Sequence, residues 1–170
     1  IEPCYYSKTL YFDELYVSKK ISGMKTAARV DAKRIDSWIS RYCHTKGLFL
    51  SDEQAAAVKG IVAEQFSILT GGPGCGKTTT TQVVVKLLEA MKLKVLLAAP
   101  TGRAAQRMTE VIGSESKTIH RLLEWQVENF KKNEKNPLDV DFLVVDECSM
   151  LDISLTASLL KAVPDRSQVL

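Results

Sequence analysis

The sequence predicts an α/β fold built on a parallel sheet that is covered by helices on both faces. Three short and almost continuously apolar runs, at residues 66–70, 95–99 and 142–145, indicate buried strands. Helix-like stretches alternate with these runs, which is typical of a parallel sheet. A glycine-rich loop, residues 71–78, directly follows the first run. Because ligands bind at the carboxyl ends of the strands in such sheets, we expect the functional site at that edge.

The composition bounds the size and setting of the protein. With 170 residues, 45% hydrophobic and 25% charged, the chain can bury one ordinary core. We expect an N-terminal leader with a helix over residues 1–47 and a core domain over residues 48–170. Neither a secretory signal nor a membrane-length apolar run is evident, so we expect a soluble, cytoplasmic protein without a membrane partner. The net charge of +3 allows an acidic polymer as partner but does not require one.

The leader gives one clear element. Residues 1–24 are rich in aromatic side chains without a clean period, and we interpret them as a strand or hairpin. From about residue 28 to residue 42, apolar residues recur at helical spacing: Ile35, Trp38, Ile39 and Tyr42. Gly47 is then expected to end that helix.

A second helix is expected to begin at Ser51. The run Ser51-Asp52-Glu53-Gln54 is a capping-box pattern ahead of an apolar face. In that motif the Gln54 side chain reaches back to the backbone of Ser51. Next comes the expected strand at residues 66–70.

The loop from Gly71 to Thr78 fits the phosphate-binding pattern G-x-x-x-x-G-K-[ST] at every fixed position. Glycines let backbone N–H groups close around phosphate oxygens. The helix that follows, residues 77–91, points its positive dipole end at the phosphates. We expect ATP as cofactor, with the loop contacts provided by Gly72, Pro73, Gly74, Cys75, Gly76 and Thr79. Lys77 contacts the β- and γ-phosphates, and the Thr78 hydroxyl ligates Mg²⁺.

The remaining elements follow in order. The strand at residues 95–99 ends at Pro100, and Thr101 opens the next helix. Residues 126–141 are charged and aperiodic, which indicates an exposed loop. The strand at residues 142–145 precedes Asp146 and Glu147, and a further helix is expected near residues 151–160.

The acidic pair predicts metal and proton chemistry. If its strand neighbours the strand before the phosphate loop, both carboxylates lie beside the phosphates. Asp146 would then hold Mg²⁺ through its water shell, and Glu147 would accept a proton from the attacking water. The alternative is that these acids merely begin the following helix.

Four segments resemble, in order and spacing, the motifs of the RecD/TraA group of superfamily 1 DNA helicases: residues 69–79, 98–105, 118–123 and 144–150. The resemblance covers residues 48–170 and implies a phosphate-loop NTPase (RecA-like) core. It also implies that Gln54 recognises adenine, a role that can coexist with capping. By the same resemblance, single-stranded DNA would be contacted by Pro100, Thr101, Gly102, Arg103, Thr118 and His120. The alternatives are a helix start for the first group and a packing role for His120. Hydroxyls, amides and an arginine suit phosphate contacts that ignore base sequence.

The resemblance implies a function for the parent protein. It would be an ATP-dependent DNA helicase acting on single-stranded DNA, with 5′ to 3′ movement, in recombination or repair. We expect a core that is truncated before its last strands, a second motor domain elsewhere, and little or no activity of this chain alone. A nuclease complex as partner is left open. Two other interpretations are a stand-alone nucleotide- or DNA-binding module without turnover and another phosphate-loop ATPase.

Overall fold

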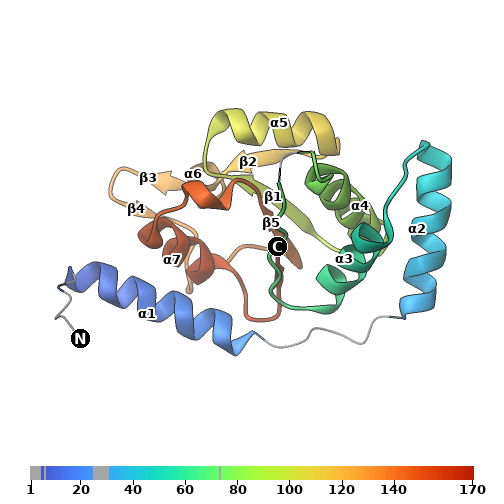
Figure 1. The fold of residues 1–170 in the computed structure, drawn as a ribbon. Helices are drawn as coiled ribbons and strands as arrows, with labels where there is room; N and C mark the ends of the chain where they lie inside the picture. Colours follow the sequence, from blue (N-terminus) through green and yellow to red (C-terminus); the bar gives the residue numbers. More distant parts are fainter. Residues whose placement is uncertain (1–4, 6, 25–30, 73) are drawn as a thin grey trace.

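A four-stranded parallel sheet forms the centre of the molecule in the computed structural model, which describes residues 5, 7–24, 31–72 and 74–170 (Figure 1). The strand order is β2-β1-β5-β6, with β1 at Val95–Ala99, β2 at Ser116–Thr118, β5 at Phe142–Val145 and β6 at Gln168–Val169. All three pairings are parallel. The parallel sheet and the strands expected at residues 95–99 and 142–145 are therefore confirmed.

Helices cover both faces of this sheet, as predicted. Leu97, Phe142 and Val144 pack in one core with α3 (Asp52–Ala63), α4 (Lys77–Ala90) and α5 (Gly102–Ile112). Ala98 and Leu143 face the other core, which includes α6 (Ile119–Leu122) and α7 (Ile153–Ala162). Alternate residues of β1 and β5 thus point to opposite faces, as the period of two in a strand requires.

The strand expected at residues 66–70 is not present. Phe66 makes an isolated parallel bridge with Val169, and the Ser67 N–H donates to the Val169 carbonyl at 2.9 Å. Beyond these contacts Ile68 is 78% exposed. The neighbouring strand β6 has two residues, so it offers too few partners to extend the ladder. Because β6 lies between this segment and β5, the hypothesis that the loop and acidic strands are sheet neighbours is wrong.

The strand or hairpin expected within residues 1–24 is instead a helix, α1 (Lys8–Gly23). Its half-buried residues mix charged and apolar types, and most of them recur at helical spacing: Asp13, Leu15, Tyr16, Val17, Lys20 and Ile21. Asp13 accepts hydrogen bonds from Ser154 at 2.7 Å and Lys161 at 3.5 Å, so polar contacts join α1 to α7. Burial and a hydrogen bond to Glu134 raise the pKa of Tyr16 to about 12. A hydrophobic pattern does not detect a helix whose contact face is partly polar.

The second leader helix, α2, spans Ala32–Lys46 and ends at Gly47 in the left-handed conformation, as expected. Asp31 caps its first turn, and the expected start near residue 28 lies outside the described residues. Ile35 and Ile39 join the core of α3 and α4. In the described chain, every helix is too short or too polar to cross a membrane.

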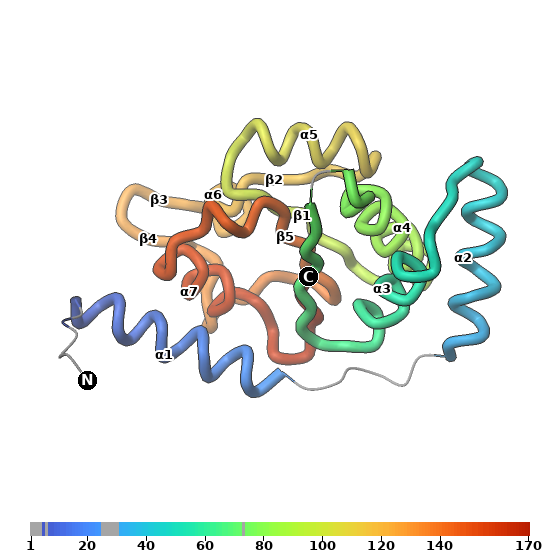
Figure 2. Tube along the Cα trace, viewed as in Figure 1, coloured from blue at the N-terminus to red at the C-terminus, as the bar shows by residue number. Residues whose placement is uncertain are grey.

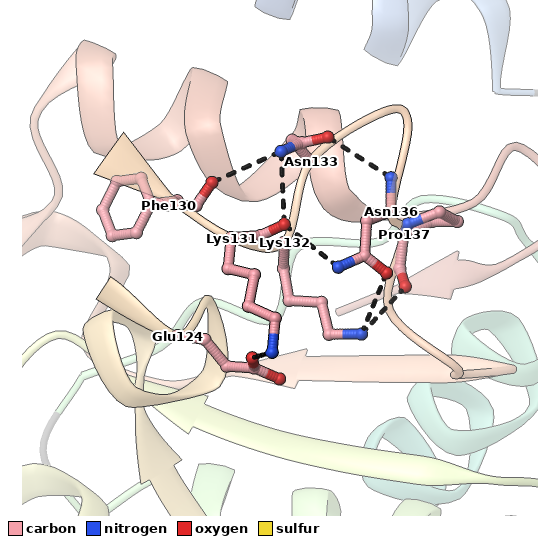
Figure 3. A network of polar contacts seen from close by, with 7 residues as sticks. All are labelled: Glu124, Phe130, Lys131, Lys132, Asn133, Asn136 and Pro137. Carbon is pink, nitrogen blue, oxygen red and sulfur yellow. Dashed lines mark hydrogen bonds and ion pairs between the residues drawn. The ribbon is translucent and has the colours of Figure 1, made fainter. Parts of the chain in front are cut away.

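Residues 126–141 are more ordered than the expected exposed loop. Strands β3 (Trp125–Gln126) and β4 (Asn129–Phe130) form an antiparallel hairpin. In the turn that follows, the Asn133 amide donates to the Phe130 and Lys131 carbonyls at 3.3 and 3.2 Å (Figure 3). Leu138 and Val140 are then buried in the second core. Two-residue strands are too short to give a periodic signal, and the many charges conceal the two buried anchors.

Candidate nucleotide and DNA site

The phosphate loop depends on two glycines in the left-handed region. Gly74 has φ +79° and Gly76 has φ +74°, where side chains are disfavoured. A Cβ atom added at Gly76 would lie 2.2 Å from Gln54 Nε2, so a side chain there would displace the Gln54 amide. Gly76 is the N-cap of α4, which begins at Lys77. Pro73 lies outside the described residues.

The first turn of α4 contains Lys77 and three consecutive threonines, which differ in their exposure. The Lys77 ammonium lies over the loop and donates to the carbonyls of Gly71 and Gly72, the latter at 3.0 Å. Thr78 is exposed and Thr79 is half-buried. Thr80 is buried, and its hydroxyl donates to the Gly76 carbonyl at 3.1 Å. Thr80 therefore anchors the loop to the helix, a role that the sequence reasoning did not identify.

Gln54 connects α3 to the phosphate loop. Its backbone N–H donates to Ser51 Oγ at 3.2 Å, and its Oε1 accepts from the Ser51 N–H at 2.9 Å, so the expected capping box is complete. The Nε2 group of the same side chain donates to the Cys75 carbonyl at 3.1 Å. The Gln54 amide is thus held on both sides: its oxygen by the capping bond to Ser51, and its nitrogen by the Cys75 carbonyl of the loop.

The acidic pair lies at the carboxyl end of β5. The Asp146 N–H donates to the Ala98 carbonyl at 3.0 Å, and Asp146 Oδ1 accepts from the Glu147 N–H at 2.9 Å. Glu147 has φ +55°, a conformation that is uncommon for residues other than glycine and that occurs at functional sites. Both side chains are exposed.

The alternative that the acidic pair begins the next helix is wrong. A 3-10 turn, η1 (Cys148–Met150), separates the pair from α7. The cap of α7 is Asp152, whose carboxylate accepts from the Leu155 N–H at 2.7 Å. The side chains of Asp146 and Glu147 are therefore not used to start α7.

These residues fit ATP and Mg²⁺. Two left-handed glycines leave the loop backbone open beside the N-terminus of a helix, the arrangement that binds phosphate. The Thr78 hydroxyl and the Asp146 carboxylate provide oxygen donors, which Mg²⁺ prefers. In the sheet, β6 lies between the segment that leads into the phosphate loop and β5, which leads into Asp146. A metal ion held by both Thr78 and Asp146 would therefore connect the phosphate loop with the end of β5.

The residues expected to contact DNA lie at or just after the carboxyl ends of two neighbouring strands, β1 and β2. Ala99 of β1 pairs with Thr118 of β2; α6 begins directly after β2, and two residues separate the end of β1 from the start of α5. The Thr101 and Thr118 hydroxyls cap these helices, each accepting a backbone N–H at 3.2 Å. Pro100 is half-buried, while Gly102 and Arg103 are exposed.

His120 forms an aromatic group with two residues of the β3–β4 hairpin. Its ring lies 6.0 Å from Trp125 and 5.6 Å from Phe130, between ring centres. Trp125 and Phe130 are 4.7 Å apart, across the β3–β4 hairpin. His120 is exposed and also packs against these two rings, so the packing interpretation stands beside the interpretation as a DNA contact. The sequence reasoning missed Phe130 because it treated residues 126–141 as a loop, and it gave no role to Trp125, which directly precedes that range.

Comparison with known proteins agrees with this arrangement. A protein-family model described as an AAA domain matches residues 54–170. The ATP-dependent RecD2 DNA helicase of Deinococcus radiodurans is 44% identical over 135 residues, which cover 79% of this chain and 19% of that protein. The RecBCD enzyme subunit RecD of Haemophilus influenzae is 35% identical over 146 residues, covering 71% of this chain and 23% of that protein. The RecBCD enzyme subunit RecD of Mycolicibacterium smegmatis is 34% identical over 144 residues, which cover 69% of this chain and 26% of that protein.

The chain spans between 19% and 26% of the length of these relatives. The matched family model covers the phosphate loop, the acidic pair and the carboxyl edge of the sheet. The resemblance noted from the motifs is thus confirmed, and the chain belongs to the AAA-domain family and is of the RecD type.

Proposed function

We propose that residues 48–170 form the ATP-binding half of an ATP-dependent DNA helicase motor, preceded by the leader at residues 1–47. The observation that supports this most strongly is the shared edge of the sheet. The acidic pair follows β5 there, and the proposed DNA contacts follow the neighbouring strand β1 and its partner β2. ATP hydrolysis and DNA contact would therefore take place at the carboxyl ends of neighbouring β-strands.

In this proposal the roles of the site residues follow from their chemistry. When bound, ATP with Mg²⁺ supplies a reactive γ-phosphate and a metal that neutralises its charge. The loop amides and Lys77 hold the phosphates, while Thr78 and Asp146 hold the metal. Glu147 orients water and accepts its proton. The Asp146 carboxylate accepts from the Glu147 N–H, and this bond helps to hold the left-handed backbone from which the Glu147 side chain extends.

Adenine selectivity is proposed to depend on the amide of Gln54. The variant Gln54→Glu keeps an oxygen that can accept from the Ser51 N–H, but it removes the Nε2 donor that contacts Cys75. We expect this variant to keep the capping bond to Ser51, to lose some stability because its carboxylate repels the Cys75 carbonyl, and to lose its preference for ATP over GTP. Competition between the two nucleotides against a fluorescent ATP analogue measures the preference.

Ser51→Ala is the matched control for this experiment. It removes the hydroxyl half of the capping box and should cost about 1 kcal/mol of stability, while the amide at the loop remains. ATP preference should therefore survive. If Gln54→Glu keeps the ATP preference as well, Gln54 acts as a cap alone.

Single-stranded DNA is the proposed substrate, and its phosphates are the proposed point of contact. We expect DNA to stimulate ATP hydrolysis by the full-length protein, and the affinity to fall with salt while hardly varying with base sequence. Arg103→Ala should lower the salt slope of binding by about 0.7, the value for one phosphate contact on a single strand. Fluorescence anisotropy at several salt concentrations gives this slope.

Arg166→Ala removes the same charge from the exposed loop before β6, at the opposite edge of the sheet. Its salt slope should equal that of the wild type. A strong preference for one base sequence, or tight binding that is insensitive to salt, would contradict a motor-type track. Oligonucleotides with a single-stranded tail at the 5′ or the 3′ end would then test the proposed 5′ to 3′ movement.

A further inference from the structure

A basic groove lies between α2 and the C-terminal end of α4, far from the proposed DNA contacts. The groove has a volume of about 790 Å³ and is lined by four basic side chains, Lys33, Arg34, Arg41 and Lys92. Asp31 is the one carboxylate in its lining, and it accepts from the Lys33 and Arg34 N–H groups as the cap of α2. The groove therefore carries a net positive charge.

These four cations are available to a ligand. All four are exposed, and within the described residues none of them forms an ion pair with a carboxylate. Other lysines of the chain do have such partners, for example Lys59 with Asp36 at 3.0 Å. Unpaired cations lining one groove repel each other, and an anion in the groove relieves that repulsion.

The basic residues of α2 share one face with an aromatic side chain. Arg34, Trp38 and Arg41 are spaced at i, i+4 and i+7, so they lie along the same side of the helix. Trp38 lines the groove and is held by stacking on Tyr42, with ring centres 4.8 Å apart. The two arginines are about 10 Å apart along the helix axis, a length over which a DNA strand presents several phosphates.

Lys92 adds an independent indication. It lies in the turn after α4 with φ +62°, in the left-handed region where glycine is favoured. A lysine at this position costs folding free energy relative to glycine, and strained positions of this kind occur at functional sites. Its side chain lines the groove opposite α2.

The position of the groove separates it from the proposed DNA contacts. It lies at the C-terminal end of α4, whose 14 residues place that end about 20 Å from the phosphate loop. In Figures 1 and 2, α2 is at the right-hand edge of the molecule and the β3–β4 hairpin is on the left-hand side. One short stretch of DNA therefore does not occupy both surfaces.

We propose that the groove between α2 and α4 binds the phosphodiester backbone of DNA, as a second contact region outside the motor's own DNA track. The proposal rests on the proposed function for its choice of polyanion. Arginines along a helix face with an intervening tryptophan suit a nucleic acid backbone, since guanidinium groups pair with phosphate oxygens. The leader would thereby hold DNA while the motor edge acts on it.

The test compares two charge-matched double variants by fluorescence anisotropy with labelled single-stranded and duplex DNA. Arg34→Gln/Arg41→Gln should weaken binding on the order of tenfold at low salt and lower the salt slope by about 1.4 on single-stranded DNA and about 1.8 on duplex DNA. Lys8→Gln/Lys19→Gln removes the same charge from exposed positions on α1 and should leave both quantities near wild type. The DNA form that loses more affinity identifies which strand arrangement the groove accepts.

The variant Lys92→Gly distinguishes a loss of DNA affinity from a loss of protein stability. The glycine suits the left-handed turn, so the melting temperature should rise while the salt slope falls by about 1. Equal DNA binding by the groove variant and the α1 control would overturn the proposal. Binding of poly-glutamate that is tighter than DNA binding and is lost in the groove variant would also overturn it. If Arg103→Ala is silent too, the proposed DNA-binding function itself has failed.

Discussion

Replacing Glu147 by glutamine is expected to lower ATP hydrolysis by the full-length protein at least a hundredfold while nucleotide binding persists. General-base assistance is worth roughly 10²- to 10⁴-fold, and an amide cannot accept the proton from water. Glutamine has the same size and no greater aversion to the left-handed backbone at this position, so the fold should be preserved. Steady-state phosphate release and titration with a fluorescent ATP analogue measure the two effects separately.

The neighbouring residue provides the control for this variant. Cys148→Ser keeps a side chain that can donate to the Val145 carbonyl, which the Cys148 thiol contacts at 3.1 Å. Its turnover should stay close to wild type. Near-normal hydrolysis by Glu147→Gln would assign the base to another residue, and a loss of nucleotide binding would mean that the variant disturbs the site as a whole.

Replacing Lys77 by alanine should weaken nucleotide binding roughly 10- to 150-fold. In the proposed function the lysine would provide a charged hydrogen bond to phosphate, and bonds to charged groups are worth about 1.5–3 kcal/mol. The variant also loses the lysine's contacts with the Gly71 and Gly72 carbonyls, while the Thr80 hydroxyl still binds the Gly76 carbonyl at the start of α4. Titration of the purified chain with a fluorescent ATP analogue measures the loss.

Lys86→Ala is a suitable comparison on the same helix. Lys86 pairs with Glu89 at 2.9 Å and lies more than two turns beyond the loop, so its removal changes the charge of α4 without touching phosphate. Nucleotide affinity should change by less than about twofold, as expected for a surface ion pair. Equal affinity of Lys77→Ala and wild type would refute the phosphate role of Lys77.

The sequence predicted those parts of the fold that depend on neighbours a few residues away. The capping box at Ser51, the left-handed end of α2 at Gly47 and the strands β1 and β5 all follow from local patterns. The phosphate loop was likewise predicted from eight consecutive residues, and its glycine conformations agree with that prediction. The adenine, metal and DNA roles stay predictions until the variants above are measured.

The failures share one physical cause. The segment after Phe66 has the composition of a strand but lacks a partner long enough to pair with it. The first helix is stabilised by contacts such as Asp13 with Ser154, which join residues far apart in the chain. The buried anchors Leu138 and Val140 were hidden among exposed charges. In each case the free energy comes from a partner that local periodicity does not reveal.

By itself the sequence determined the chemistry that the chain can offer: a phosphate loop, an acidic pair and two sets of helix-starting hydroxyls. Only the tertiary structure decided how these groups meet. It placed β6 between the loop and the acidic strand, fixed the Gln54 amide against Cys75, and gathered His120 with two aromatic residues of the hairpin. Residue types are local properties, whereas sheet order and side-chain contacts depend on which distant segments bury their apolar surface together.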